Sequence, residues 1–548
     1  MLITANIEEK SVGPKLLIKN TKLKLQEGEK VGFIGRNGVG KTTLLRIIDG
    51  ADADYTGSID SKPNLVMITT DQEQAARPGI TVLDYVLDGL RKYRTLTRVI
   101  EEYPDIMGED LKKISEFSDA LDLYSQYGYH HVVDQVRESL RAYQLTDSQI
   151  DGEFLQLSGG QKRFAQLVQV EYSNADLLIL DEPTNHMDYI AKENFITWLK
   201  QTYSSVLVIS HDRDVLQAVS RIIELKDRQI HSFKGNYDAF LRQNALSNLS
   251  SMHQYEVDVK TLENRRDALR QAEIKKLRCK QSPNPFVPLV RRLQKEITEL
   301  ETRLAKPSIW IDQSSFGGLK KVDSERYAKY KTKNIEVRTE NSASQSQLLI
   351  EIDNLSLGYD TPLFQPFSVA IRAGDKVRII GRNGAGKTTL VDAIYATSQS
   401  HAINSKVYSG VIDCSPSLKI GRYEQEINEQ YLDKTLAETI TSIYRHAERQ
   451  INDEILYALL NEYLFAPSDK DILVRQLSGG QKARIQLIAL FVGRPNLIIL
   501  DEPTNHLDLP SIEELEAALQ RYQGAIVYIS HDSYFASALG GEGILIGE

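Results

Sequence analysis

The residues best suited to chemistry in this chain are two acidic pairs, Asp181-Glu182 and Asp501-Glu502, which open the strings DEPTNHMD and DEPTNHLD. Each pair follows an apolar run, and a histidine stands 29 positions after each glutamate, at His211 and His531. Buried parallel strands deliver such residues at their carboxyl ends. We expect the aspartates to orient Mg²⁺, the glutamates to activate water and the histidines to contact the γ-phosphate of a nucleotide. The alternative for an acidic pair is a solvated strand end.

Two glycine-rich strings, GRNGVGKT at Gly35–Thr42 and GRNGAGKT at Gly381–Thr388, fit the pattern GxxxxGKT. The backbone N–H groups of such a loop and the N-terminus of the helix that follows surround phosphates. Its lysine should reach the β- and γ-phosphates, and its threonine should bind Mg²⁺. A glycine-rich turn without a ligand is the alternative. The predicted nucleotide-binding residues of the two loops are Gly35, Arg36, Asn37, Gly38, Val39, Gly40, Lys41, Thr42 and Thr43, and Gly381, Arg382, Asn383, Gly384, Ala385, Gly386, Lys387, Thr388 and Thr389.

The string LSGGQ also occurs twice, and its serine and glycines suit the start of a helix. The helix dipole favours an anion there, and glycines allow close backbone approach. We expect Gly35–Thr42 to pair with Ser478–Gln481, and Gly381–Thr388 with Ser158–Gln161, so that two ATP molecules are sandwiched between the halves and hydrolysis opens them. The residues assigned to nucleotide binding in these strings are Ser158, Gly159, Gly160, Gln161, Ser478, Gly479, Gly480 and Gln481.

Two glutamines and one tyrosine complete the predicted sites. Gln72 and Gln425 each follow a short apolar stretch, where a glutamine can orient water and Mg²⁺; a surface glutamine is the alternative. Aligning the halves places Tyr359 opposite Gly13. An aromatic residue at this position can stack on adenine, and such stacking contributes about 1–3 kcal/mol per base. We therefore expect unequal nucleotide sites, unless Tyr359 merely packs against the protein.

The motifs recur in the same order in both halves of the 548-residue chain, which predicts two ATP-binding cassettes. Each is expected to be an α/β domain of the phosphate-loop ATPase type. From the LSGGQ string to the histidine the halves differ by a constant 320 positions, whereas the first half has about 33 extra residues before that string. We predict a first ATPase domain over residues 1–237, with a helical insertion at about 85–127, and a second over residues 341–548. The interdomain linker then occupies residues 238–340.

The linker is predicted to be a helical hairpin. Residues 241–280 contain no Pro or Gly, and a tip at residues 281–289 contains Pro283, Pro285 and Pro288, which interrupt a helix. Between Lys260 and Lys295 there are 11 Lys and Arg residues against three acidic ones, a density that suits phosphate contacts. An exposed coiled-coil face is the alternative. The candidate RNA contacts are Lys275, Lys276, Arg278, Lys280, Phe286, Arg291 and Arg292.

The distribution of charge narrows the function classes. The formal net charge of −9 argues against a general nucleic-acid binder, but residues 241–340 carry a net charge of +8, which favours a localised contact with a polyanion. Two cysteines are too few for a disulfide framework or a zinc site, so a cytoplasmic location is expected. No apolar run approaches the length of a membrane-spanning helix, and no membrane domain is expected.

These motifs resemble those of the ABC-F family, tandem-cassette ATPases without a membrane domain. The resemblance rests on DEPTNH and LSGGQK, each present twice, on GNYDAF at Gly235–Phe240 and on the basic linker, and it covers nearly the whole chain. It implies an Mg²⁺-dependent ATPase that binds the ribosome in the tRNA exit site, with the linker pointing toward the peptidyl-transferase centre. Contacts with rRNA and tRNA are implied, and the cassettes would pair within a monomer.

The tip resembles that of ABC-F members that protect ribosomes against antibiotics, so ribosome protection is the expected function. A housekeeping ABC-F translation factor is the first alternative. The ATPase subunit of an ABC transporter is less favoured, because a basic hairpin has no evident use there. A DNA-repair or chromosome ATPase is disfavoured by the lack of zinc cysteines and of a coiled coil that splits a cassette, so no DNA is expected as a partner.

Overall fold

The computed structural model describes the chain except for residues 14, 71–77, 107, 186, 280–283, 304–346, 424–426, 464, 506 and 548. At residues 248–249 and 251–252 it describes the backbone alone. The chain divides into two compact units. One consists of Met1–Tyr237 with Asn334–Glu548 and contains both cassettes, and the other is Asp238–Lys333. Among the described helices, none has the length and apolar character needed to cross a bilayer.

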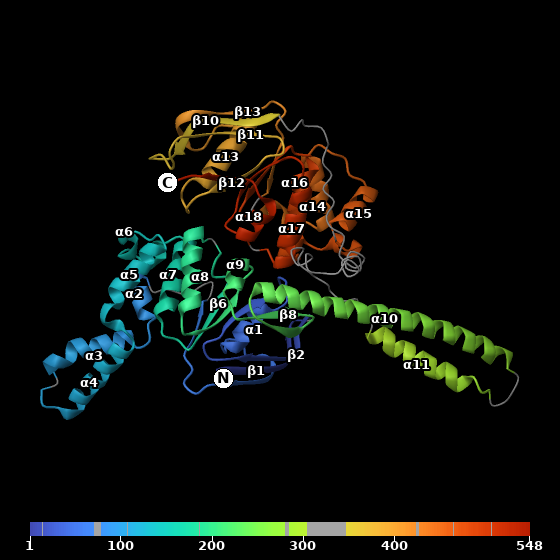
Figure 1. Ribbon diagram of the computed structural model, residues 1–548, viewed down its shortest axis with the longest axis horizontal. Helices are drawn as coiled ribbons and strands as arrows, with labels where there is room; N and C mark the ends of the chain where they lie inside the picture. The colour runs from blue at the N-terminus through green and yellow to red at the C-terminus, as the bar shows by residue number, and fades with distance from the viewer. Residues whose placement is uncertain are drawn as a thin grey trace. The chain divides into compact units, whose positions relative to one another are not determined.

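The described part of the first cassette contains two sheets (Figure 1). The larger runs in the order β5-β6-β7-β3-β8-β9 and is parallel except where β8 meets β9; the smaller is antiparallel, in the order β2-β1-β4. The central strands β6 and β7 are short apolar runs that are almost completely buried, as expected for strands covered on both faces. The strands are β1 (Ile3–Val12), β2 (Lys15–Leu25), β3 (Lys30–Ile34), β4 (Thr56–Ser61), β5 (Met67–Thr70), β6 (Leu177–Asp181), β7 (Ser205–Ile209), β8 (Arg221–Lys226) and β9 (Gln229–Lys234).

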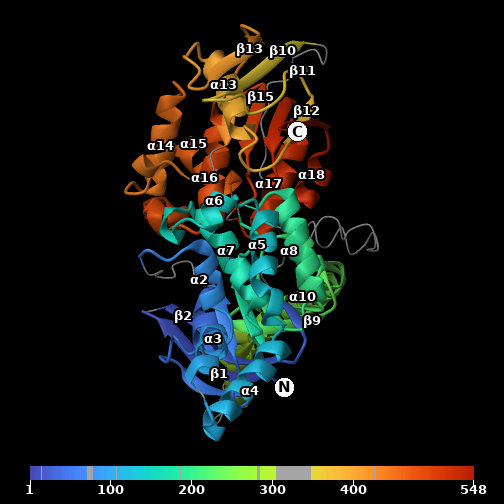
Figure 2. The same cartoon turned by 90° about the vertical axis from the view of Figure 1, so that its left-hand side faces the viewer.

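The helices of the first cassette include a group, α2, α5 and α7, that lies side by side in both views (Figures 1 and 2). Two further helices, α3 and α4, pack against each other and lie within the range expected for the insertion, 85–127. The helices are α1 (Lys41–Ile48), α2 (Val82–Asp88), α3 (Tyr93–Ile106), α4 (Leu111–Gln126), α5 (Val132–Ala142), α6 (Asp147–Ile150), α7 (Gly159–Tyr172), α8 (Tyr189–Gln201) and α9 (Arg213–Gln217).

The second cassette repeats this plan. Its parallel sheet has the order β14-β15-β16-β12-β17, and its antiparallel sheet has the order β11-β10-β13. The strands are β10 (Leu348–Gly358), β11 (Phe367–Arg372), β12 (Lys376–Ile380), β13 (Lys406–Cys414), β14 (Ile420–Tyr423), β15 (Leu497–Asp501), β16 (Ala525–Ile529) and β17 (Glu542–Leu545). The helices are α13 (Lys387–Ser398), α14 (Leu436–His446), α15 (Asp453–Glu462), α16 (Gly479–Val492), α17 (Leu509–Arg521) and α18 (Ser533–Leu539).

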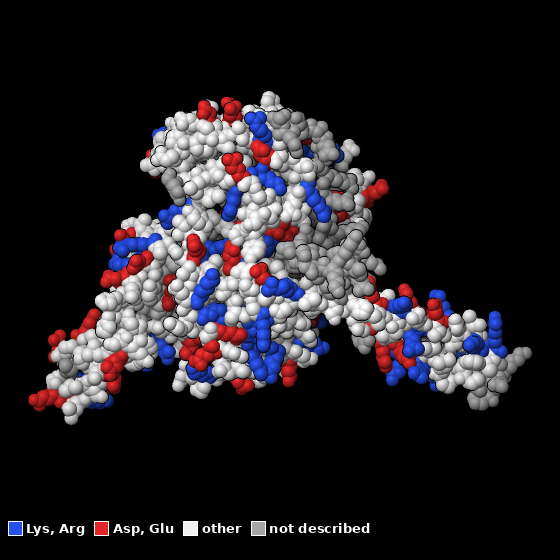
Figure 3. Space-filling view, in the orientation of Figure 1, with Lys and Arg blue, Asp and Glu red and all other residues white. Residues whose placement is uncertain are grey.

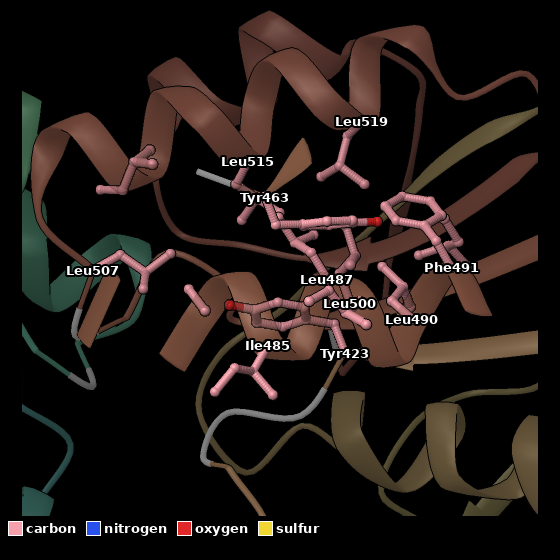
Figure 4. Close-up of a cluster of buried hydrophobic side chains, with 14 of the residues drawn as sticks. Tyr423, Tyr463, Ile485, Leu487, Leu490, Phe491, Leu500, Leu507, Leu515 and Leu519 are labelled. Carbon is pink, nitrogen blue, oxygen red and sulfur yellow. The ribbon is translucent and has the colours of Figure 1, made fainter. Parts of the chain in front are cut away.

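A large apolar core holds the helices of the second cassette against its parallel sheet. In Figure 4, Leu487 of α16 and Leu515 of α17 lie close to the ring of Tyr463, and Leu500 of β15 lies below them. All four side chains are at most 4% exposed. Truncating a leucine packed in this way typically costs about 2–5 kcal/mol. This core fixes β15 and the starts of α16 and α17, which carry the predicted site residues of this cassette.

The linker unit contains two long helices, α10 (Tyr237–Arg278) and α11 (Val287–Arg303). Arg265 lies 3.2 Å from Glu296, and Arg266 lies 2.6 Å from Glu301, so ion pairs join the two helices into a hairpin. The tip is shorter than predicted, because residues 287–289 form the first turn of α11. Pro288 is tolerated there because the first N–H groups of a helix have no intrahelical partner.

Candidate functional site

The two phosphate loops, Gly35–Thr42 and Gly381–Thr388, lead directly into α1 and α13. The residues that cap these helices, Gly40 and Gly386, have φ values of 108° and 92°, in the left-handed region that glycine tolerates. A Cβ at Gly386 would also lie 3.1 Å from Leu363. The sequence GKT therefore lets each loop turn sharply so that the first N–H groups of a helix open toward the loop.

The lysine of each phosphate loop folds back over its own loop. Lys41 Nζ donates to the Gly35 carbonyl at 2.6 Å, and Lys387 Nζ donates to the Gly381 carbonyl at 2.9 Å. Both lysines are less than 10% exposed, and burial lowers the pKa of each amino group. Each amino group therefore lies inside the loop that is predicted to hold phosphates, where an anion would favour its charged form.

The residues predicted to bind Mg²⁺ meet in both cassettes. Thr42 Oγ1 donates to Asp181 Oδ2 at 3.2 Å, and Thr388 Oγ1 donates to Asp501 Oδ2 at 2.8 Å. A hydroxyl and a carboxylate are hard oxygen ligands, which Mg²⁺ prefers, and in nucleotide sites phosphates and water complete its shell. Each pair therefore fits a cation that is held jointly with a nucleotide.

The two glutamates adopt a strained backbone. Glu182 and Glu502 have φ values of 47° and 45°, which are uncommon for residues with a Cβ. Their N–H groups donate to the carbonyls of Ile209 and Ile529 on the adjacent strands, at 2.9 and 3.0 Å. These bonds hold each glutamate at the carboxyl edge of its parallel sheet. Strain held in this manner commonly marks a functional position.

Burial also changes the protonation of the glutamates and histidines. It raises the pKa of Glu182 to about 8 and that of Glu502 to about 7. It lowers the pKa of both His211 and His531 to about 3, so these rings are neutral at physiological pH. A carboxyl group with a pKa near 7 can accept a proton from water, because its acidity is matched to the operating pH.

Each histidine lies beside its glutamate. His211 Nε2 is 3.5 Å from Glu182 Oε1, and His531 Nε2 is 3.3 Å from Glu502 Oε1. The backbone N–H of each histidine donates to the other carboxylate oxygen, at 3.4 and 3.3 Å. Lys41 Nζ is a further 3.1 Å neighbour of His211 Nε2. Each glutamate thus forms a cluster with the histidine that stands 29 positions after it.

The serine of each LSGGQ string caps a helix through a reciprocal pair of bonds. Ser158 Oγ accepts from Gln161 N–H at 3.4 Å, while Gln161 Oε1 accepts from Ser158 N–H at 3.1 Å; Ser478 and Gln481 repeat the arrangement. This capping box uses both polar residues of the string to start α7 and α16. A Cβ at Gly159 or Gly160 would meet no atom within 4 Å, so the N-terminus of α7 is open, whereas Gly480 at the start of α16 is buried beside Ser511.

A cavity of about 920 Å³ joins residues of both cassettes. Its lining includes Ser158, Gly160 and Gln161 from the first cassette and Gly384, Lys387 and Thr388 from the second, together with both glutamates and both histidines. We call the site at Gly381–Thr388 the second site and that at Gly35–Thr42 the first site. The phosphate loop Gly381–Thr388 and the LSGGQ string of the first cassette, which were predicted to share the second site, therefore border one cavity. We call the two LSGGQ strings the signature strings.

Two aspartates that the sequence analysis did not assign link the cassettes at both sites. Asp508 Oδ2 accepts from Asn37 N–H at 3.1 Å, and Asp188 Oδ2 accepts from Asn383 N–H at 3.1 Å. Asp188 ends the string DEPTNHMD and caps α8, and Asp508 ends the string DEPTNHLD and caps α17. The presence of an aspartate at the same position in both halves could have marked these residues as functional. Their partners across the cassettes, however, can be identified only in the folded chain.

The aromatic position differs between the sites. Tyr359 borders the cavity and is 61% exposed, so its ring is accessible, and its carbonyl accepts from Tyr408 OH at 3.0 Å. Gly13 has a φ of 57° and open space where a Cβ would stand. Burial against the protein, the alternative for Tyr359, is therefore wrong. Gln72 and Gln425 lie outside the described residues.

A second difference between the halves lies just after the signature strings. The Arg163 guanidinium donates to the Asp181 carbonyl, whereas Ala483 stands at the equivalent position of the second half. Arg484 instead forms two bonds of 2.8 Å with Glu514 on α17. The side chains after the two signature strings therefore support different neighbours.

Comparison with known proteins agrees with this architecture. The family model described as ABC transporter matches residues 18–185 and 364–505. The putative ATP-binding protein YdiF of Bacillus subtilis is 30% identical over 98% of this chain and 79% of its own length. ABC transporter F family member 2 of Arabidopsis thaliana is also 30% identical, over 95% of this chain and 72% of its own length.

Solved structures with the same fold are more distant in sequence. The archaeal ribosome recycling factor aABCE1, in complex with the ribosomal stalk protein aP1, has a TM-score of 0.56 and 16% identity, covering 98% of this chain and 86% of that chain. The RNase-L Inhibitor has a TM-score of 0.54 and 16% identity, covering 99% and 87%. These likenesses show the fold alone.

Fold and site together define a tandem ATP-binding cassette protein. The chain belongs to the ABC transporter family and, within it, to the ABC-F proteins. It is an ATPase that hydrolyses ATP to ADP and phosphate.

Proposed function

We propose that this ATPase binds the ribosome near the tRNA exit site and acts through its linker on the peptidyl-transferase centre, protecting translation against antibiotics. The observation that carries the proposal is the linker hairpin. Its first helix, α10, has 42 residues, which corresponds to about 63 Å at 1.5 Å per residue. Such a length suits a probe that reaches into a large partner.

The charge of the hairpin supports contact with RNA near its end. Lys275, Lys276 and Arg278 are exposed in the last turn of α10, and Arg291 is exposed on α11. Arg292 differs, because its guanidinium is 2.9 Å from Glu296, so part of its charge is neutralised within the helix. Figure 3 shows acidic and basic side chains intermingled along the hairpin. We therefore assign phosphate contacts to its end, with rRNA and tRNA as the partners.

The tip offers apolar groups as well as charge. Phe286 is half-buried, and its N–H donates to Asn284 Oδ1 at 3.0 Å, so the backbone before α11 is ordered locally. Leu277 and Leu289 are 85% and 43% exposed. We propose that Phe286 stacks on RNA bases and that these leucines add apolar contacts beside it. The alternative is that the tip side chains form a small apolar core of their own. Lys280, the remaining predicted contact, lies outside the described residues.

The cassettes would bind and hydrolyse the ATP that controls ribosome binding. We propose that Lys41, Lys387 and the N-termini of α1 and α13 hold the phosphates of two ATP molecules, that Thr42 with Asp181 and Thr388 with Asp501 hold Mg²⁺, and that Gln72 and Gln425 orient water. A bound Mg²⁺ would neutralise charge on the β- and γ-phosphates. Glu182 and Glu502 would activate the attacking water, and His211 and His531 would contact the γ-phosphates.

Hydrolysis then controls release. The signature strings at Ser158–Gln161 and Ser478–Gln481 would close on the γ-phosphates held by the opposite cassettes, and Tyr359 would stack on the adenine of the second site. Loss of the γ-phosphates would remove the anion between the cassettes and allow them to separate. We propose that the protein acts in this manner as a cytoplasmic monomer, without a membrane or DNA partner.

The proposal is tested by shortening the tip. Residues 281–286 are replaced by a short glycine-containing turn, and α11 is retained from Val287. We expect ATPase activity and ribosome binding to persist, while rescue of in-vitro translation from an antibiotic that targets the peptidyl-transferase centre is lost. A matched control replaces Leu111 by serine, since this side chain is 82% exposed on α4, outside the hairpin. Full rescue by the shortened protein would refute a role for the tip.

The second candidate is a housekeeping translation factor, and the same fold and linker support it equally. The experiment separates the two: if the unaltered protein restores no translation with any drug of this type but stimulates drug-free translation, the housekeeping function holds.

A further inference from the structure

A buried lysine connects the first cassette to the histidine loop of the second. Lys192 lies on α8 and is 7% exposed. Its Nζ is 2.9 Å from Asp212 Oδ2, 2.6 Å from Asp214 Oδ2 and 2.9 Å from the main-chain carbonyl of His531. These three acceptor groups match the three protons of an ammonium group. Burial alone would lower the pKa of Lys192, but the two carboxylates outweigh it and raise this pKa, so the lysine stays charged.

The carbonyl that Lys192 binds belongs to the residue that contacts Glu502. His531 donates its backbone N–H to Glu502 Oε2 at 3.3 Å, and its ring lies 3.3 Å from Glu502 Oε1. The Lys192 ammonium therefore reaches the water-activating carboxylate of the second site through a single residue, His531. It touches neither the phosphate loop nor the carboxylate itself.

Neighbouring contacts fix the same loop from the same side. Ser533 Oγ donates to Asp214 Oδ1 at 2.6 Å, and the Arg213 guanidinium binds Glu516 at 2.7 Å and lies 5.6 Å from the centre of the Tyr534 ring. Gln217 donates to Tyr534 OH at 2.6 Å. The residues that follow His531 are thus held by α9 and the loop before it in the first cassette.

The repeat does not reproduce this arrangement at the first site. The residue equivalent to Lys192 is Ile512, which has no group that can donate a hydrogen bond, and the residues equivalent to Arg213 and Asp214 are Ser533 and Tyr534. The charged connection to a histidine loop therefore runs in one direction, from the first cassette to the second site.

We propose that Lys192 is a positioning residue that couples the His531 loop of the second site, and not the His211 loop of the first, to contact between the cassettes. When the cassettes are together, Lys192 holds the His531 loop and with it Glu502 in place. When they part, the carbonyl loses its donor and the carboxylate loses its alignment, so ATP at the second site is protected from hydrolysis until closure. The inference rests on the proposed roles of Glu182 and Glu502.

The test measures Lys192→Met in three backgrounds: the otherwise unaltered protein, Glu182→Gln, in which turnover reports the second site, and Glu502→Gln, in which it reports the first. We expect kcat in the Glu182→Gln background to fall on the order of tenfold, as for loss of one charge-assisted bond, with KM for ATP little changed. In the Glu502→Gln background the rate should be unchanged. Lys200→Met, which removes an exposed lysine from the same helix, is the control and should alter neither rate.

Turnover at the first site also shows that the variant is folded. An equal loss at both sites would mean that Lys192 is merely structural, and no loss at either would mean that it does not position the loop; both results overturn the inference. If the Glu182→Gln, Glu502→Gln protein keeps turnover, the carboxylate assignment has failed instead; if a single parent variant already lacks turnover, the two sites are coupled and that background cannot report one site. The otherwise unaltered background then decides, since an unchanged kcat for Lys192→Met there overturns the inference as well.

Discussion

Replacing Tyr359 by alanine tests whether the two nucleotide sites bind ATP differently. The Tyr359 ring is 61% exposed at the edge of the cavity, and Gly13 stands opposite it in the repeat. Stacking of a base on an aromatic ring contributes about 1–3 kcal/mol, so Tyr359→Ala should raise the Kd for ATP at the second site by about 5- to 150-fold. Because the substitution removes an exposed ring, the fold should be unaffected.

The assay is calorimetric titration of ATP in a Lys41→Ala background, in which the first site is disabled. Inorganic triphosphate is titrated in parallel, because it engages the phosphate loop but has no base to stack. Tyr203→Ala, which removes a 97% exposed tyrosine from the first cassette, is the matched control. An unchanged Kd for ATP, or an equal loss of affinity for triphosphate, would refute the stacking argument.

The remaining predictions concern hydrolysis. Glu182→Gln combined with Glu502→Gln should abolish multiple-turnover ATPase activity while ATP still binds, because an amide cannot take a proton from water; near-normal hydrolysis would contradict the assignment. Activity should rise with pH, since burial raises the pKa of Glu182 to about 8 and that of Glu502 to about 7, and each acts as a base only when deprotonated. The kcat/KM–pH profile, which reports the nucleotide-free protein, should therefore have its midpoint near pH 7 for Glu182→Gln and near pH 8 for Glu502→Gln; a profile that does not rise with pH would contradict a buried carboxylate base.

The sequence was sufficient to predict the elements that carry the site. Apolar runs before Asp181 and Asp501 predicted buried strands, and the glycine-rich strings predicted turns into helices, because these properties depend on local backbone chemistry and on burial. The capping boxes at Ser158 and Ser478 are likewise local. Duplication of the motifs made the tandem architecture readable without any structure.

Contacts between distant segments could not be predicted in the same way. Asp188 and Asp508 bind the backbone of the opposite phosphate loop, and Lys192 binds the carbonyl of His531, 339 residues away. No spacing in the sequence encodes those pairings. The start of α11 was misplaced for a different reason: Pro288 was read as a helix breaker, but it occupies the first turn, where proline costs no hydrogen bond.

The central claim, ATP-dependent binding to the ribosome, is tested most directly by sedimentation. The Glu182→Gln, Glu502→Gln protein is incubated with purified ribosomes and ATP or ADP and centrifuged through sucrose. The account predicts that the variant pellets with ribosomes in ATP and stays in the supernatant in ADP, and that Lys275→Glu with Lys276→Glu weakens pelleting without altering ATP binding. Failure to pellet in ATP, at a concentration where nucleotide binding is saturated, would contradict it.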